Sequence, residues 1–541
     1  MTGGTIQSID YAAVAAPLVL VLVAGLVLLL DAFLPARPGG ARALGLVTLG
    51  GLAAALAVVA AQAVSGATRR TFCVPASLGG ESASGRAAAA SCSFVADRFT
   101  LVIAAVVLAA GLVVVLLSMT EIAVQRGTGP AERGRIPAGE WYFLLLATLT
   151  GAVLLPASRD LIMLVVSLEL VSLPVFALTA LRRHDGRASE AALKLFLVSV
   201  VSTAITLFGV SLLYGVTGSV HLGRIAAALR TAGDTAGDMA QVTAVAVVLV
   251  VAGFAFKIAA VPFHFWAADV YRGAPVPIAA LLSVVSKASG FAGLILLLTS
   301  ALAGQAALWA PGVAVVAALT MTAGNVLAMR QRAAVRLLAW SSVAQSGYIL
   351  APLAAYAAEP HAAPHAEPRV AVGASVAYLV FYAAMNLIAF SVVTLMARRH
   401  ADDPGDLSGG GFGSEGDAET GDLEAYRGLV WRSPAAGLSL AFALVCLAGL
   451  PPGLAGLFAK IVVFRAVVDG GLGWLAVVVA ANTVAGLYYY IAWTARLFAP
   501  PAAGESRTVS TRAAAGVAVA VTVAVTVVFS VAPQVVLSVA Q

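Results

Sequence analysis

The sequence predicts an all-α, polytopic membrane protein of about fourteen transmembrane helices. Of its 541 residues, 61% are hydrophobic and 11% are charged, whereas soluble domains carry about 25% charged residues. The chain contains fourteen apolar runs, and most of them reach the roughly 20 residues that a helix needs to cross a bilayer. These observations exclude a soluble single-core enzyme, a nucleic-acid-binding protein and a disordered chain.

The apolar runs follow one another along the chain and are too long and too uniformly apolar for the strands of an outer-membrane barrel. The run at 141–157 is short and is bounded by Pro156. The first ten residues lack a basic segment, so we expect the first run to be a retained helix and not a cleaved signal. The predicted spans are 11–33, 43–64, 99–119, 141–157, 160–180, 190–214, 241–268, 276–301, 312–329, 337–356, 374–397, 435–468, 472–497 and 513–532.

The arginines indicate how these spans are oriented. If the N-terminus lies outside and the spans alternate, nineteen arginines fall in inner loops and eight in outer loops, which satisfies the positive-inside rule. Both termini are then predicted on the outer, periplasmic side. The formal net charge of +6 is therefore explained by loop topology and not by a site for polyanions.

Two loops have unusual sequences. Residues 401–424, rich in Gly, Asp and Glu, are predicted to be a flexible cytoplasmic insertion. Their GxGxxG pattern at 411–416 follows no strand and lies in acidic surroundings, which argues against a nucleotide site. The outer loop 65–98 carries Cys73 and Cys92. Because that compartment can be oxidising, we predict a disulfide, with two free thiols as the alternative.

All four lysines lie within apolar spans, whereas nearly all of the 28 arginines lie in loops. A charge at the bilayer centre costs about 2.5–3.5 kcal/mol, and a buried lysine can release its proton whereas an arginine cannot. Lys257, Lys287 and Lys460 lie near mid-span, which favours a role as proton carriers. Lys194 lies near a span end, four residues after Glu190, so it is either a proton carrier or an ion-pair partner of that acid.

Glu169 is the acid that lies clearly in mid-span. It needs a partner that offsets its desolvation, and Lys257 or Lys194 can supply one. His264 follows Lys257 by seven residues, or two helical turns, so the two side chains are expected to share a helix face. His264 is then either a member of a proton relay or a packed hydrogen-bonding residue.

Prolines interrupt two of the lysine-bearing spans. Pro262 follows Lys257, and Pro451 and Pro452 precede Lys460. Proline breaks a helix, and paired broken spans are typical of inverted repeats around an ion path. We therefore predict two inverted five-helix repeats, each with the broken span as its fourth member. The predicted units are 1–139 (helices 1–3), 140–301 (first repeat), 310–498 (second repeat, with the insertion) and 513–541 (the last helix).

Four stretches of the sequence resemble those of a known family, the antiporter-like membrane subunits of respiratory complex I, most closely the NuoN type. They are Ser167-Leu168-Glu169-Leu170-Val171-Ser172-Leu173-Pro174, Phe256 to Pro277, Ser283-Val284-Val285-Ser286-Lys287, and Leu447 to Lys460. The string Asp269-Val270-Tyr271-Arg272-Gly273-Ala274-Pro275 and the lysine at 460 favour NuoN over its sister subunits. Because the sequence ends nine residues past its last predicted span, we also expect no long lateral helix of the NuoL type. Trp340 and Gln345 stand where the family usually has tyrosine and histidine.

The resemblance implies a proton-translocating membrane-arm subunit of an NADH:quinone oxidoreductase, a translocase of the respiratory chain in the bacterial inner membrane. Protons would move along a central axis from Glu169 and Lys257 through Lys287 to Lys460. The resemblance places FMN, the iron–sulfur clusters and quinone with other subunits and no cofactor in this chain. The sequence agrees, because its three cysteines form no cluster.

The partners implied by the resemblance are NuoM-type and NuoK-type neighbours, the lateral helix of a NuoL-type subunit and the lipid bilayer, with no nucleic acid. Two alternatives stay open from the sequence. The first is a cation/proton antiporter subunit of the Mrp type, which shares the lysine pattern. The second is a scaffold of the membrane arm that pumps no protons.

Overall fold

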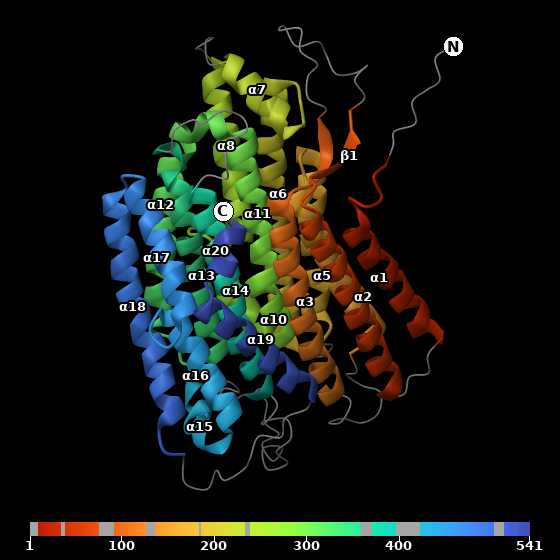
Figure 1. Cartoon of the computed structure of the whole chain (residues 1–541), viewed down its shortest axis with the longest axis vertical. Helices are drawn as coiled ribbons and strands as arrows, with labels where there is room; N and C mark the ends of the chain where they lie inside the picture. The colour runs from red at the N-terminus through yellow and green to blue at the C-terminus, as the bar shows by residue number, and fades with distance from the viewer. Residues whose placement is uncertain are drawn as a thin grey trace.

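Long α-helices that run roughly side by side account for most of the computed structural model (Figure 1). The structure describes residues 9–33, 38–74, 91–125, 136–182, 185–232, 238–358, 370–396, 422–501 and 513–540. Within these residues, twelve helices are long and apolar enough to cross a membrane. A spanning segment in lipid must satisfy its backbone groups internally, and a helix does so. The predicted all-α membrane class is confirmed.

The N-terminal helices α1 and α2 form one side of the molecule (Figure 1), and α4 packs against α5. α1 packs against α2 and α4, and α3 packs against α2, α4 and α19. A two-stranded antiparallel hairpin connects α2 to α3. The elements are α1 (Ala15–Phe33), α2 (Pro38–Ser65), β1 (Arg69–Cys73), β2 (Cys92–Ala96), α3 (Arg98–Gln125), α4 (Ala138–Leu154) and α5 (Leu161–Ala180).

The middle of the chain packs around a helix that is almost wholly buried. The segment Val276–Ala301 is formed by α10 and α11, which are joined and followed by π-helical turns at Leu282–Ser286 and Leu297–Ala301. Single π-helical turns inside helices are frequent at functional sites. The other elements of this region are α6 (Gly186–Thr217), α7 (Leu222–Ala232), α8 (Asp238–Lys257), α9 (Trp266–Gly273), α10 (Val276–Leu281) and α11 (Lys287–Leu296).

The C-terminal half places α13 and α14 in the interior and α17 and α18 on the side opposite α1 (Figure 1). α19 crosses back over the bundle and packs against α3, α14 and α17. This packing brings a helix near the C-terminus against α3 in the N-terminal part of the chain. The elements are α12 (Ala306–Ala328), α13 (Ala334–Ala354), α14 (Val370–Met396), α15 (Leu429–Arg432), α16 (Pro434–Ala448), α17 (Leu454–Asp469), α18 (Gly473–Phe498), α19 (Ala513–Val531) and α20 (Gln534–Ala540).

Two predicted spans fall on helices outside these twelve. The span at 337–356 corresponds to α13, whose residues are buried from Leu337 to Ala354 although several of them are polar. The span at 435–468 corresponds to α16 and α17, which are 15 and 16 residues long. The count of fourteen and the inverted repeats stay predictions.

The three prolines that were expected to interrupt spans, Pro262, Pro451 and Pro452, lie in non-helical segments. The predicted break in the span 241–268 is present, because α8 ends at Lys257, five residues before Pro262, and α9 begins at Trp266. Ala259 between them has a φ of 55°, in the left-handed region, and Pro262 has no backbone N–H to continue a helix. In the second span, α16 ends at Ala448, and the next residue, Gly449, has a φ of 82°, a common way for glycine to terminate a helix.

The hairpin of β1 and β2 was not anticipated, because its strands are only five residues long. Cys73 and Cys92 are paired residues of the two strands, and their Sγ atoms are bonded. Arg159 also fastens β2 to the helices, since its N–H donates to the Ser93 carbonyl and its guanidinium bonds Asp97 at 2.5 Å. Most of the 401–424 insertion, with its GxGxxG pattern, lies outside the described residues.

We expect the Cys73–Cys92 disulfide to be present in protein purified from membranes. Closing a loop of about 19 residues should stabilise the outer hairpin by about 2–4 kcal/mol. The measurement is intact mass after alkylation without reductant, with a reduced sample as the control. Alkylation of both cysteines in the unreduced sample would exclude the bond.

Candidate functional site

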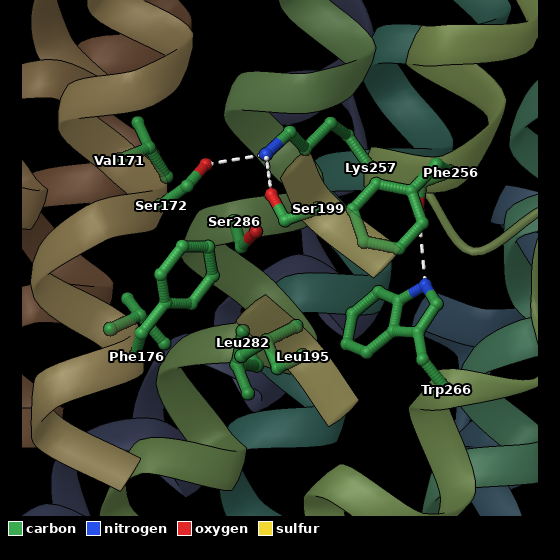
Figure 2. Close-up of a pocket in the computed structure, with 11 residues that line it drawn as sticks. Val171, Ser172, Phe176, Leu195, Ser199, Phe256, Lys257, Trp266, Leu282 and Ser286 are labelled. Atoms are coloured by element: carbon green, nitrogen blue, oxygen red, sulfur yellow. Dashed lines mark hydrogen bonds between the residues drawn. The ribbon is translucent and has the colours of Figure 1, made fainter. Parts of the chain in front are cut away.

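Lys257 is the last residue of α8, and it is buried between α5 and α6. Its Nζ donates hydrogen bonds to Ser172 Oγ at 2.5 Å and to Ser199 Oγ at 2.9 Å (Figure 2). These serines come from different helices, so they hold the ammonium group at a fixed place. Because hydroxyl groups both accept and donate, they can hold the lysine in either protonation state.

Glu169 lies on α5 beside this group. Its Oε1 is 4.0 Å from Lys257 Nζ and accepts a hydrogen bond from Thr203 Oγ1 at 2.6 Å. The carboxylate side chain is 25% exposed, whereas the lysine side chain is 8% exposed. Of the two partners that the sequence allowed for Glu169, the structure therefore places Lys257 beside it. The pair is close enough for each charge to affect the other.

A small cavity adjoins Lys257 (Figure 2). Its volume, counted as space open to the centre of a water molecule, is about 20 Å³, and one water needs roughly 10–15 Å³. Polar groups reach it from Lys257 and from Ser172, Ser199 and Ser286, and the last of these precedes Lys287. The cavity therefore has the room to hold a water molecule beside Lys257, with hydroxyl groups at its wall.

Lys287 follows directly after the π-helical turn and is 1% exposed. Its Nζ donates to the Ser342 carbonyl and, at 2.7 Å, to Ser346 Oγ, both on α13. Ser346 Oγ in turn donates to the carbonyl of Ile258 at 2.8 Å. Ser346 therefore connects Lys287 with the residue that follows Lys257.

Lys460 lies on α17 and is buried. Its Nζ donates to the Ala448 carbonyl at 2.6 Å, at the end of α16, and lies 5.7 Å from the centre of the Tyr348 ring. The C-terminal end of a helix carries partial negative charge, and an aromatic face also attracts a cation. The break at Pro451 and Pro452 follows that helix end, so it exposes the carbonyl that Lys460 uses.

Buried tyrosines and amides occupy the space between Lys287 and Lys460. Ser342 Oγ lies 2.7 Å from Tyr382 Oη, and Gln345 is bonded to Tyr378 and Tyr490. Sequence reasoning had identified Gln345 only as a departure from the family and did not identify the tyrosines. A signal was available, because Tyr378 and Tyr382 are four residues apart and share a face of a predicted helix.

Lys194 lies apart from this buried line. Its side chain is 45% exposed and forms ion pairs with Glu190 at 2.7 Å and with Asp269 at 3.2 Å. Arg336 Nη2 lies 3.9 Å from the other carboxylate oxygen of Asp269. The structure therefore places Lys194 in a half-exposed charge cluster that joins α6, α9 and α13.

His264 lies in the non-helical segment between α8 and α9, so it does not share a helix face with Lys257 as expected. The expectation assumed a helix that continued past Lys257. Its Nδ1 lies 3.3 Å from the Pro262 carbonyl, and its ring packs 5.5 Å from the Trp340 ring. No described contact joins it to the lysines. Among the described residues, no group of three or more His, Cys, Asp or Glu side chains is placed to hold a metal ion.

Comparisons with known sequences identify the family. The family model for NADH:quinone oxidoreductase/Mrp antiporter, TM, matches residues 158–486. NADH-quinone oxidoreductase subunit N 2 of Streptomyces griseus subsp. griseus is 50% identical over 512 residues, which cover 94% of this chain and 86% of the relative. Subunit N of Salinispora tropica is 43% identical over 495 residues, which cover 91% of this chain and 86% of the relative.

Two solved structures share the fold. A chain of respiratory complex I from Thermus thermophilus with bound aureothin has a TM-score of 0.71 at 28% identity, covering 97% of this chain and 98% of its own. A chain of an Mrp complex from Dietzia sp. has a TM-score of 0.74, covering 98% and 96%, but its 20% identity shows the fold alone. The chain belongs to the NADH:quinone oxidoreductase/Mrp antiporter transmembrane family, and within it to the subunit N type.

Proposed function

We propose that this chain is a proton-translocating membrane-arm subunit of an NADH:quinone oxidoreductase, complex I. The observation that carries the proposal is the buried line of Lys257, Lys287 and Lys460. Each ammonium group is held by hydroxyl or carbonyl oxygens, and among the described residues a carboxylate lies beside Lys257 alone of the three. A lysine held in this way is not locked as a cation by a tight ion pair, so it can release and regain a proton.

In this proposal the active line runs from Glu169 and Lys257 through Lys287 to Lys460. Between the first two lysines, the proposal is supported by the cavity beside Lys257 (Figure 2), which has room for water, and by Ser346, which bonds both Lys287 and the carbonyl of Ile258. The tyrosines on α14 and α18 connect Lys287 with the surroundings of Lys460. A change in the protonation state of one lysine then affects the protonation state of the next. We place Lys194 and His264 outside this line, because Lys194 is paired with surface acids and His264 with a backbone carbonyl.

The chain takes part in an enzyme without performing redox chemistry itself. We propose that FMN, iron–sulfur clusters and the quinone site belong to other subunits of the complex. The neighbours in the membrane arm would be NuoM-type and NuoK-type subunits and the lateral helix of a NuoL-type subunit. The location would be the bacterial inner membrane, with both termini on the periplasmic side, as the arginine distribution predicts.

Copurification tests this assignment. A tagged chain extracted in mild detergent is expected to bring with it an assembly that contains flavin and iron–sulfur clusters and oxidises NADH. The flavin and iron content and the NADH:quinone activity of the purified assembly are the measurements. A cofactor-free complex that exchanges cations for protons would instead support the Mrp-type antiporter.

A further inference from the structure

The backbone that follows Lys257 is held by a hydroxyl group from another helix. The N–H of Val261, in the segment between α8 and α9, donates a hydrogen bond to Thr320 Oγ1 on α12 at 2.9 Å. In an unbroken helix this N–H would donate to the carbonyl of Lys257, four residues earlier. Thr320 is fully buried, and its hydroxyl donates to the Val316 carbonyl, one turn earlier in α12, at 2.5 Å. The threonine therefore offers its acceptor side to the interrupted backbone.

The second interruption is held in the same way. The N–H of Ala455, near the start of α17, donates to Ser530 Oγ on α19 at 3.2 Å. Ser530 Oγ in turn donates to the Thr526 carbonyl, again one turn earlier in its own helix, at 2.9 Å. The first N–H groups of a helix have no partner within that helix, and Ser530 supplies one in a buried place. α17 is the helix that carries Lys460, five residues after Ala455.

The two hydroxyl groups also correspond in their place along the chain. Thr320 lies on the next long helix that the structure describes after the predicted unit 140–301, and Ser530 lies on the next one after the unit 310–498. Hydroxyl side chains in helices often bond the carbonyl four residues earlier, but these two also accept a backbone N–H from an interruption. The shared construction indicates a common role at the two interruptions.

We propose that Thr320 and Ser530 are positioning residues, which hold the two interruptions in place and so fix where Lys257 and Lys460 present their ammonium groups. The inference rests on the proposed function and refines it. Without the hydroxyl, an N–H inside the protein loses its acceptor, which is unfavourable, so the backbone at the interruption shifts to find another. A displacement of about 1 Å can lower a rate by about 100-fold. The lysines would then still be present but less well placed to transfer protons.

Thr320→Val removes the first hydroxyl at nearly constant volume. We expect the assembled complex in vesicles to take up protons about tenfold more slowly than the wild type, because an acceptor of a backbone N–H is lost. Thr320→Ser keeps the hydroxyl and is expected to restore most of the rate. If the threonine served only to fill space through its methyl group, serine would not restore the rate and valine would.

Thr526→Val is the matched control, because it makes the same substitution at another fully buried threonine. The Thr526 hydroxyl donates to the Thr522 carbonyl of its own helix at 2.9 Å and, among the described contacts, accepts no backbone N–H. We expect this variant to keep the wild-type rate. Ser530→Ala, one turn further along α19, is expected to lose about tenfold. The measurement is the initial rate of proton uptake at equal subunit content.

A wild-type rate in Thr320→Val or in Ser530→Ala, an equal loss in Thr526→Val, or no recovery in Thr320→Ser would overturn the inference. A complex that assembles only when the hydroxyl is present would also contradict it, because the contact would then serve folding and not positioning. The proposed function fails separately, by full proton translocation in the lysine variants. If the lysine variants lose translocation while Thr320→Val and Ser530→Ala keep it, only the present inference is overturned.

Discussion

Lys257→Arg is expected to lower NADH-driven proton translocation of the assembled complex by about 100-fold. A positioned proton-transfer group contributes about 10²–10⁴-fold to a rate, and arginine keeps the charge but does not release its proton. The guanidinium group is also larger and planar, so it cannot replace an ammonium that bonds Ser172 and Ser199 from two helices. The measurement is the initial rate of proton uptake by vesicles, with equal subunit content confirmed for each variant.

Lys257→Ala is expected to lose translocation as well, for a second reason. It removes the cation beside Glu169 and leaves that carboxylate with Thr203 as its described partner. Lys194→Arg is the matched comparison, because the exposed pairs of Lys194 with Glu190 and Asp269 accept either cation. Full activity in Lys257→Arg would show that the position needs a fixed charge and that the proton-carrier account is wrong.

Lys460→Met is expected to lose nearly as much translocation as Lys257→Arg, although Lys460 lies on a distant helix in the second half of the chain. Methionine keeps the length of the side chain and adds no buried polar group. The lost interactions are the hydrogen bond to the Ala448 carbonyl and the contact with the Tyr348 ring. The rate of proton uptake by vesicles measures the loss.

Arg465→Met is the control for this variant, because Arg465 lies on the same helix with its side chain 80% exposed and paired only with Asp469 among the described contacts. It loses the same formal charge as Lys460→Met. We expect its translocation rate to remain near that of the wild type. An equal loss in the two variants would mean that the net charge of α17, and not the buried lysine, matters.

The sequence was sufficient to locate twelve of the predicted spans and the four charged positions within apolar runs, Glu169, Lys257, Lys287 and Lys460. Long apolar runs have few structural solutions in a membrane, and a lysine is conspicuous in a chain that otherwise uses arginine. Proline and glycine also identified both interruptions, because each has a local backbone effect. These features depend on a few neighbouring residues, which is why they can be read without a structure.

Contacts between helices could not be predicted in the same way. The serines that hold Lys257 and Lys287 are common residues, and their roles depend on how α5, α6 and α13 are packed. The same is true of Asp269, which pairs with Lys194 across 75 residues of chain. His264 was placed wrongly for a local reason: the shared face assumed a helix that continued through His264, whereas α8 ends at Lys257.

The contacts of the buried tyrosines could be predicted from the sequence only in part. Tyr378 and Tyr382 are four residues apart, so a shared face was predictable. Their partners, Gln345 and Ser342, lie on another helix and follow only from the packing of α13 against α14. The sequence could identify polar positions inside an apolar helix, but the hydrogen bonds between them required the structure.

The central claim is that the buried lysines act as one unit, and the double variant Lys287→Met/Lys460→Met tests it most directly. Residues that act as a unit have strongly non-additive effects, whereas independent, distant sites have effects that add. The measurement is proton-coupled turnover in vesicles for the two single variants and the double variant, with assembly verified by subunit content. We predict that either single variant loses nearly as much turnover as the double variant. Small single losses that sum in the double variant would contradict the account and would leave Lys460 as an anchor for the break at Pro451 and Pro452.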